Sequence, residues 1–183
     1  MKNPPKLIII TGPSGVGKGT VVKNILKKDK NIWLSISSTT REPRKGEEHG
    51  KDYYFLTTKK FKEMIKNEMF LEWAEFAGNY YGTPVKTIKE KLKNGYKVIL
   101  EIEVEGAYQI REKFLNTISI FLLPPNKREL EKRIRNRATD NETSILKRLE
   151  RADFEMSSSK DFDHVLKNYE VDKTVDDILK IIS

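Results

Sequence analysis

The sequence predicts an α/β domain built on an open parallel sheet. Three observations favour this fold class. Predicted strands and helices alternate along most of the chain, the first strand leads through a glycine-rich stretch into a helix, and the segment from about 37 to 84 alone breaks the alternation. Alternating strands and helices are typical of a parallel sheet covered by helices. A chain of 183 residues fits one domain and is long enough to bury a full core.

The first two elements flank a conspicuous turn. Residues 7–11 read LIIIT, a continuous apolar run that is typical of a parallel strand covered on both faces. Residues 18–29 carry apolar side chains at helical spacing. The turn between them reads GPSGVGK and matches the pattern Gly-x-x-x-x-Gly-Lys. Because strand, spacing, lysine and helix agree, we favour a phosphate-binding loop over an ordinary glycine- and proline-rich turn.

In such a loop, backbone N–H groups point at phosphate oxygens, and the start of the helix adds partial positive charge. Lys18 can then reach the β- and γ-phosphates. Gly19 stands where many of these loops place a hydroxyl that holds Mg2+. Thr20 lies about 100° further round the helix and is poorly aimed to replace it. The residues expected to contact the nucleotide here are Gly12, Pro13, Ser14, Gly15, Val16, Gly17, Lys18, Gly19 and Thr20.

Apolar spacing and turn residues place the remaining elements in order. Helices are expected at residues 59–67, 84–93, 105–113 and 172–182, with two more on either side of a polar break at 138–143. Strands or extended segments are expected at 33–36, 53–57, 70–76, 79–83, 96–102, 117–123 and near 164–166. Residues 37–52 read as a loop rich in Ser, Thr, Arg and Gly. The strands between 37 and 84 follow one another closely, which indicates a small mixed-β insertion.

Composition narrows the function classes. The 35 Lys and Arg outnumber the 27 Asp and Glu, and the net charge of +8 favours polyanionic ligands. The chain has no cysteine, which excludes disulfides and thiolate metal sites and fits a cytoplasmic location. No apolar stretch approaches the length of a membrane span, and the N-terminal residues do not form a signal peptide. The two histidines, His49 and His164, are far apart and are expected to be structural or solvated.

A second charged constellation follows the strand at 33–36. Arg41 and Arg44 flank a proline, which stiffens the turn that carries them. Two guanidinium groups on a rigid loop can hold a phosphate by bidentate contacts, and Tyr53 and Tyr81 can add hydroxyl donors. A solvated charged loop is the alternative. Beside a phosphate-binding loop elsewhere in the chain, a second phosphate site implies transfer between the two.

The motifs SSTTREPRKGEEHGKDYYF, FLEWAEFAGNYYGTP and KRLERADFEM, together with the glycine-rich loop, resemble the guanylate kinases in order and over essentially the whole chain. The resemblance implies a P-loop nucleoside monophosphate kinase fold. Its expected parts are a core (1–36, 84–125 and 152–183), a GMP-binding insertion (37–83) and a helical lid (126–151). It implies transfer of the γ-phosphoryl of ATP to GMP, and to dGMP, with Mg2+ as cofactor.

The resemblance also implies roles for individual residues. Those expected to face the guanine are Ser37, Glu72 and Thr83, and those expected to hold the GMP phosphate are Arg41, Arg44, Tyr53 and Tyr81. The lid arginines expected to bracket the transferring phosphoryl are Arg133, Arg137 and Arg148, with Lys18 and Arg41 as further catalytic residues. One carboxylate can accept both donors of guanine, N1–H and the exocyclic amine, which suits Glu72. An outward-facing strand residue is the alternative for Glu72.

The sequence departs from the family pattern at two places. After the third core strand the family commonly has Asp-Ile-Asp followed by a Gln-Gly pair, whereas this chain reads EIEVEG. Glu101 and Glu103 are expected on one side of that strand, where they would reach Mg2+ through water, and Glu103 is also expected to contact GMP. The family's usual Asn-Asp near the adenine appears as Asn168–Tyr169, and Asn168 is expected to contact adenine alone.

Three alternatives compete with this reading. Guanylate-kinase-like scaffold modules bind proteins and lack catalysis, but they typically lose the glycine-rich loop that this chain retains. The positive charge favours nucleic acid, but no RNA- or DNA-binding motif is present. Other nucleoside monophosphate kinases share the glycine-rich loop but not SSTTREPR or GNYYGT. The expected partners are therefore ATP and GMP, with no nucleic acid, membrane or obligate protein partner.

Overall fold

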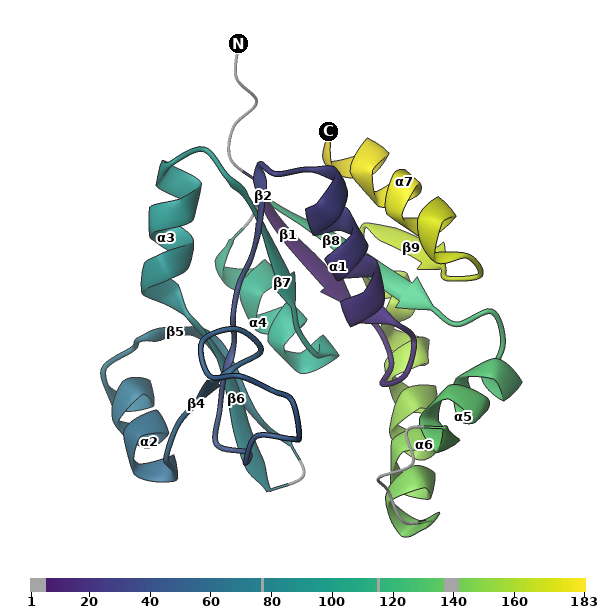
Figure 1. Cartoon of the computed structure of the whole chain (residues 1–183), viewed down its shortest axis with the longest axis horizontal. Helices are drawn as coiled ribbons and strands as arrows, with labels where there is room; N and C mark the ends of the chain where they lie inside the picture. Colours follow the sequence, from purple (N-terminus) through teal and green to yellow (C-terminus); the bar gives the residue numbers. More distant parts are fainter. Residues whose placement is uncertain (1–5, 77, 115, 137–141) are drawn as a thin grey trace.

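The computed structural model describes residues 6–76, 78–114, 116–136 and 142–183, and it confirms the α/β class (Figure 1). The larger of two sheets is entirely parallel, and its strands lie in the order β2-β7-β1-β8-β9. The bounds of these strands are β1 Leu7–Thr11, β2 Ile32–Leu34, β7 Lys97–Glu101, β8 Thr117–Leu123 and β9 His164–Lys167. Successive parallel strands need crossover connections, and helices supply most of them.

The central strand β1 explains why its sequence is a continuous apolar run. Ile8 and Ile10 pack in one core with α1 (Lys18–Lys28) and α7 (Val171–Ile182). Leu7 and Ile9 point to the opposite face and pack in a second core with α3 (Val85–Lys93) and α4 (Val104–Lys113). Both faces of the sheet are therefore covered, and all five residues of β1 are buried.

The smaller sheet has the order β4-β3-β6-β5 and contains both parallel and antiparallel pairs. Its elements are β3 Ser38–Thr39, β4 Tyr54–Phe55, α2 Thr58–Lys66, β5 Phe70–Phe76 and β6 Asn79–Pro84. Phe61 of α2 is fully buried and stacks on Phe70, with ring centroids 4.4 Å apart. The strand β3 lies in the stretch expected to be a loop. It is two residues long and pairs through its backbone, so no apolar alternation marks it.

Two helices project from the parallel sheet. Helix α5 (Lys127–Arg135) and helix α6 (Glu142–Ser157) share a small apolar cluster that is separate from the two cores of the sheet. The cluster is formed by Leu130, Ile134, Ile145 and Ala152. A short 3-10 turn, η1 (Ser158–Asp161), connects α6 to β9. Arg137, expected at the active site, lies outside the described residues. No helix in the described part of the chain is long and apolar enough to span a membrane.

Candidate active site

The glycine-rich loop joins β1 to α1, and its backbone requires glycine at two points. Gly17 caps α1 with φ of 101°, a left-handed conformation that side chains other than glycine rarely adopt. A Cβ atom on Gly12 would lie 2.3 Å from the backbone oxygen of Leu122. The loop therefore packs directly against β8, and Val16, which is fully buried, fixes it to the core.

The first turn of α1 offers donors to an anion. No acidic side chain lies in that turn, and no side chain caps its N–H groups. Lys18 is only 9% exposed, and its Nζ donates to the carbonyl oxygen of Gly12 at 2.5 Å. The ammonium group thus lies across the loop. Free N–H groups, the helix dipole and one lysine together make a site for phosphate.

Two side chains from distant elements brace this loop at one atom. The carbonyl oxygen of Val16 accepts from Nδ2 of Asn168 at 2.9 Å and from Nη1 of Arg133 at 3.2 Å. Oδ1 of Asn168 in turn accepts from the hydroxyl of Thr174 on α7 at 3.0 Å. Beside the braced loop lies a cavity of about 280 Å3, lined by Gly15, Gly17, Thr20, Arg133, Asn168, Tyr169 and Val171.

Glu101 lies beside the position that lacks a hydroxyl. A Cβ atom built on Gly19 would be 3.6 Å from Oε1 and 3.8 Å from Oε2 of Glu101, which is ordinary contact. Glu103 differs from expectation, because β7 ends at Glu101 and Glu103 occupies the N-cap position of α4 rather than a strand. The helix starts at the next residue and leaves no room for a longer strand. Both glutamates nevertheless line one cavity of about 260 Å3 together with Lys18.

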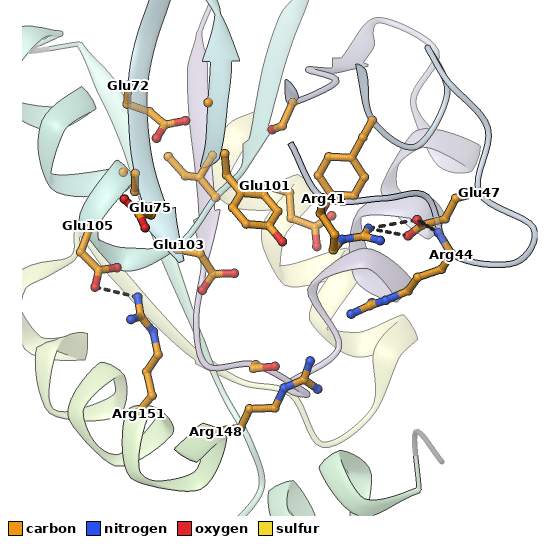
Figure 2. A pocket seen from close by; sticks show the side chains of 18 residues that line it. Arg41, Arg44, Glu47, Glu72, Glu75, Glu101, Glu103, Glu105, Arg148 and Arg151 are labelled. Atoms are coloured by element: carbon orange, nitrogen blue, oxygen red, sulfur yellow. Dashed lines mark hydrogen bonds and ion pairs between the residues drawn. The ribbon is translucent and has the colours of Figure 1, made fainter. Parts of the chain in front are cut away.

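A further cavity of about 230 Å3 lies between the two sheets and α6 (Figure 2). Its two ends differ in their main charge, and each also holds a residue of the opposite sign, Arg151 beside Glu105 and Glu47 beside Arg41. Glu72, Glu75 and Glu105 gather at one end and Arg41 and Arg44 at the other, while Arg148 reaches in from α6. The full lining is Ser14, Ser37, Arg41, Arg44, Glu47, Tyr53, Glu72, Ala74, Glu75, Tyr81, Gly82, Glu101, Ile102, Glu103, Glu105, Gly106, Arg148 and Arg151. Because Ser14 belongs to the glycine-rich loop, this cavity opens beside that loop.

Glu72 is buried rather than outward-facing. It is 6% exposed, and it lies where the register of β5 against β6 shifts between Phe70 and Trp73. A bulge of this kind redirects side chains. Oε1 of Glu72 accepts from the hydroxyl of Thr83 at 2.5 Å. Burial raises the pKa of Glu72 to about 7, against the lowering effects of the Thr83 hydroxyl and Lys113.

The backbone of α4 packs against the carboxylate of Glu72. A Cβ atom on Gly106 would lie 2.6 Å from Oε2 of Glu72, closer than real Cβ contacts. Gln109, on the same helix, accepts from the N–H of Trp73 at 3.3 Å and donates to its carbonyl at 2.9 Å. The absence of a side chain at position 106 therefore lets β5 approach α4 and sets the depth at which Glu72 lies.

Arg41 is clamped by a carboxylate from its own loop. Its Nη2 donates to both oxygens of Glu47, at 2.9 and 3.0 Å, and Glu47 also accepts from the backbone N–H of Arg44 at 2.7 Å. The Arg41 guanidinium carbon lies 5.5 Å from the centre of the Tyr53 ring. Burial and the charge of Glu101 raise the pKa of Tyr53 to about 12, so its hydroxyl stays a donor.

The structure brings most of the expected residues together. The cavity between the sheets contains Ser37, Arg41, Arg44, Tyr53, Glu72, Tyr81, Glu103 and Arg148, and Thr83 joins it through Glu72. Arg133 lies instead with the glycine-rich loop. Sequence reasoning missed Glu47, Glu75, Glu105, Gly106 and Arg151. Arg151 and Glu155 carry one local signal, the spacing of four residues that suits a helical ion pair, whereas no pattern relates Glu105 to Arg151.

A family model described as "Guanylate kinase" matches residues 4–183. The chain belongs to the guanylate kinase family. It is 65% identical over 182 residues to a guanylate kinase of Prochlorococcus marinus (strain MIT 9312). This match covers 100% of the present chain and 99% of that protein. A guanylate kinase of Synechocystis sp. (strain ATCC 27184 / PCC 6803 / Kazusa) is 48% identical over 97% of this chain and 93% of its own length.

A solved structure agrees with the family. The crystal structure of guanylate kinase from Anaplasma phagocytophilum matches with a TM-score of 0.83 and 34% sequence identity. The match covers 99% of this chain and 86% of that chain. The two chains therefore share their overall fold.

Proposed function

We propose that this chain transfers the γ-phosphoryl of ATP to GMP, giving ADP and GDP. The cavity between the sheets carries this proposal, because the buried Glu72 lies at one end, Arg41 and Arg44 lie at the other, and the cavity opens beside the glycine-rich loop. An acceptor with a donor-rich base and an anionic tail matches a cavity with carboxylates at one end and arginines at the other. GMP has that distribution, and the glycine-rich loop then holds the ATP phosphates.

Glu72 reads the guanine in this proposal. Its ionised carboxylate accepts from N1–H and from the exocyclic amine, a pair of donors that adenine lacks. Thr83 holds one carboxylate oxygen in place and Gly106 limits the depth of the other. Ser37 and Glu103 line the same cavity and supply further polar contacts to the nucleoside.

The phosphate of GMP lies against Arg41 and Arg44, with the hydroxyls of Tyr53 and Tyr81 as further donors. Arg41 is already bonded to Glu47. The phosphate must therefore share Arg41 with that carboxylate or replace it. Such an exchange favours a ligand that also bonds at the guanine end over a free phosphate ion, because the second set of contacts offsets the lost ion pair.

Transfer needs positioned positive charge rather than a general base. The GMP phosphate is largely ionised at neutral pH and is itself the nucleophile, so positioning and electrostatic stabilisation carry the catalysis. Lys18 neutralises the β- and γ-phosphates, and Arg148 reaches from α6 into the cavity that opens beside the glycine-rich loop. Residues 126–151, with Arg133 and Arg137, are proposed to be a lid over the core (1–36, 84–125 and 152–183), with residues 37–83 as the GMP-binding part.

The residues around Gly19 fit Mg2+ bound through water. The carboxylate of Glu101 lies beside the missing side chain of Gly19, and Glu103 lines the same cavity as Lys18. Oxygen ligands and retained waters are what Mg2+ prefers. When bound with ATP, Mg2+ supplies charge neutralisation on the β- and γ-phosphates. Asn168 and the cavity beside it would take the adenine. We also propose a cytoplasmic location, where both substrates are at hand.

One coupled assay tests the function. ADP formation from ATP is measured with GMP, dGMP, AMP, UMP and dTMP as acceptors, and we expect it with GMP and dGMP alone. The Lys18→Met variant is the matched control for contaminating kinases. If the wild type binds GMP but forms no more ADP than the Lys18→Met variant, the result would instead favour a protein-binding module. The retained Gly12, Gly17 and Lys18 argue against such a module.

A further inference from the structure

The acidic end of the GMP cavity holds an arginine from the proposed lid. Arg151 lies on α6, and its Nη2 is 2.7 Å from Oε1 of Glu105, a residue in the first turn of α4 (Figure 2). Among the described side chains at this end of the lining, Arg151 is the positively charged one, and it lies near Glu75, Glu103 and Glu105. Its contact with Glu105 spans 46 residues of sequence.

Arg151 is also held within its own helix. Its Nε is 2.9 Å from Oε1 of Glu155, which is 1% exposed. Burial and the nearby charge of Glu103 raise the pKa of Glu155. A half-buried guanidinium that bonds two carboxylates from two helices has little rotational freedom. Its planar fork of donors is suited to this double contact, in which a lysine would supply a single point charge.

The double contact ties α6 to the wall of the guanine end. Glu105 immediately precedes Gly106, whose backbone packs on the carboxylate of Glu72. Arg148 lies three residues before Arg151, and both side chains line the same cavity. Residues three apart share a helix face, so the rotation and height of α6 at Arg151 determine where the guanidinium of Arg148 lies.

We propose that Arg151 is a positioning residue for phosphoryl transfer, which fixes α6 to α4 through Glu105 and so holds Arg148 over the reacting phosphates. The proposal rests on the proposed function. The carboxylate of Glu105 supplies the full negative charge that makes its contact with Arg151 an ion pair. Arg151 acts through Arg148 and does not itself touch the phosphoryl.

The first test separates catalysis from binding. In Arg151→Gln, kcat should fall about tenfold or more, because misplacing a catalytic group by a fraction of its length is costly. KM for ATP and for GMP should change much less. Glu105→Gln should show the same split with a smaller loss. Lys127→Gln is the matched control, since Lys127 pairs with Asp153 on the exposed side of α6, and its kcat should match the wild type.

The second test asks whether Arg151 works through Arg148. The kcat of the Arg148→Ala/Arg151→Gln double variant should equal that of Arg148→Ala within about twofold, because coupled residues are non-additive. Losses that multiply would overturn the proposal, as would an Arg151→Gln variant that unfolds more easily yet keeps the wild-type kcat. A wild type without GMP-dependent ADP formation overturns the proposed function as well. The two failures are therefore distinguishable.

Discussion

The glycine-rich loop and the cavity between the sheets form the two ends of the proposed active site, and they present different groups to a ligand. The loop at Gly12–Gly17 presents mainly backbone N–H groups, together with the side chain of Lys18 that follows it. Distant side chains brace this loop at the Val16 carbonyl. The cavity between the sheets is made of side chains, six glutamates and four arginines among the described lining residues. A backbone site offers the same N–H groups to the phosphates of any nucleotide, whereas a side-chain site can distinguish one base from another.

The ends also differ in what a ligand must replace. At the loop, Lys18 donates to the carbonyl oxygen of Gly12. In the cavity, Arg41 is bonded twice to Glu47, and Glu72 is bonded to Thr83 and partly neutralised by burial. Selectivity at the cavity therefore comes at the cost of contacts that the protein already makes. The following substitutions test this contrast.

Lys18→Met should produce the largest effect. The methionine keeps the length of the stem but removes the charge on the β- and γ-phosphates, and such charges contribute on the order of 10²-fold or more to the rate. Turnover is measured at saturating ATP and GMP, and thermal unfolding checks that the fold is intact. Turnover within a few-fold of the wild type would mean that the loop does not depend on its lysine.

Glu72→Gln should change how stability depends on pH. The pKa of Glu72 is raised from 4.5 to about 7 in the folded protein, so the folded state favours the protonated carboxyl. Its contribution to stability is fully present below pH 4.5 and is lost as the pH rises through 7. As the pH rises from 4.5 to 7, the unfolding free energy of the variant should therefore increase by roughly 3 kcal/mol relative to that of the wild type. Chemical denaturation at pH 5 and pH 8 measures this.

The same titration predicts a proton released on GMP binding, because guanine needs the ionised carboxylate. GMP affinity of the wild type should therefore weaken below pH 7 more steeply than that of Glu72→Gln, which lacks the group. Calorimetry in two buffers of different ionisation enthalpy reports the proton directly. Parallel pH profiles for the two proteins would show that Glu72 is ionised throughout.

Arg41→Ala should weaken GMP and leave ATP nearly unchanged. A charge-assisted hydrogen bond contributes about 1.5 to 3 kcal/mol, so the loss in GMP affinity is roughly tenfold or more. Glu47→Gln is the matched control, because it removes the partner of Arg41 and keeps the arginine; its GMP affinity should equal or exceed that of the wild type. Equal losses for both nucleotides in Arg41→Ala would argue against two separate ends.

Gly106→Ala should weaken GMP several-fold although alanine is the better helix former. A methyl group there would meet Oε2 of Glu72 at 2.6 Å, so the carboxylate must move. Helix propensity alone would stabilise the protein by up to about 1 kcal/mol. Binding of ATP serves as the internal control. Unchanged GMP affinity would show that the carboxylate position is not critical.

Gly19→Ser should produce the smallest effect. The new side chain has ordinary contact with Glu101, so activity should persist, and its hydroxyl should lower the Mg2+ concentration for half-maximal rate a few-fold. Glu101→Gln should raise that concentration. Titration of Mg2+ at fixed ATP and GMP measures both. Loss of activity in Gly19→Ser would mean that this position cannot take a side chain.

What the sequence could predict follows the same contrast. The glycine-rich loop was predictable from its residues because the whole device is contiguous between a buried strand and a helix. In the cavity between the sheets, Arg41, Arg44, Tyr53 and Tyr81 were expected from their residue types to hold a phosphate. The guanine end was expected only through resemblance to a family, since its side chains come from separate elements. The burial of Glu72 depends on a register shift that no local pattern marks. The two-residue strand β3 and the contact between Glu105 and Arg151 arise only when distant segments meet.

The continuity of α6 has a mechanical consequence. The helix runs unbroken from Glu142 to Ser157 and crosses the proposed boundary between lid and core near residue 151. A rigid rod held at Arg151 behaves as a lever. At a constant rise per residue, Glu142 lies nine residues from that pivot and Arg148 three, so a rotation moves the first roughly three times as far as the second. The outer end of the rod can therefore sweep over the ligands while the arginine nearest the chemistry moves about a third as far.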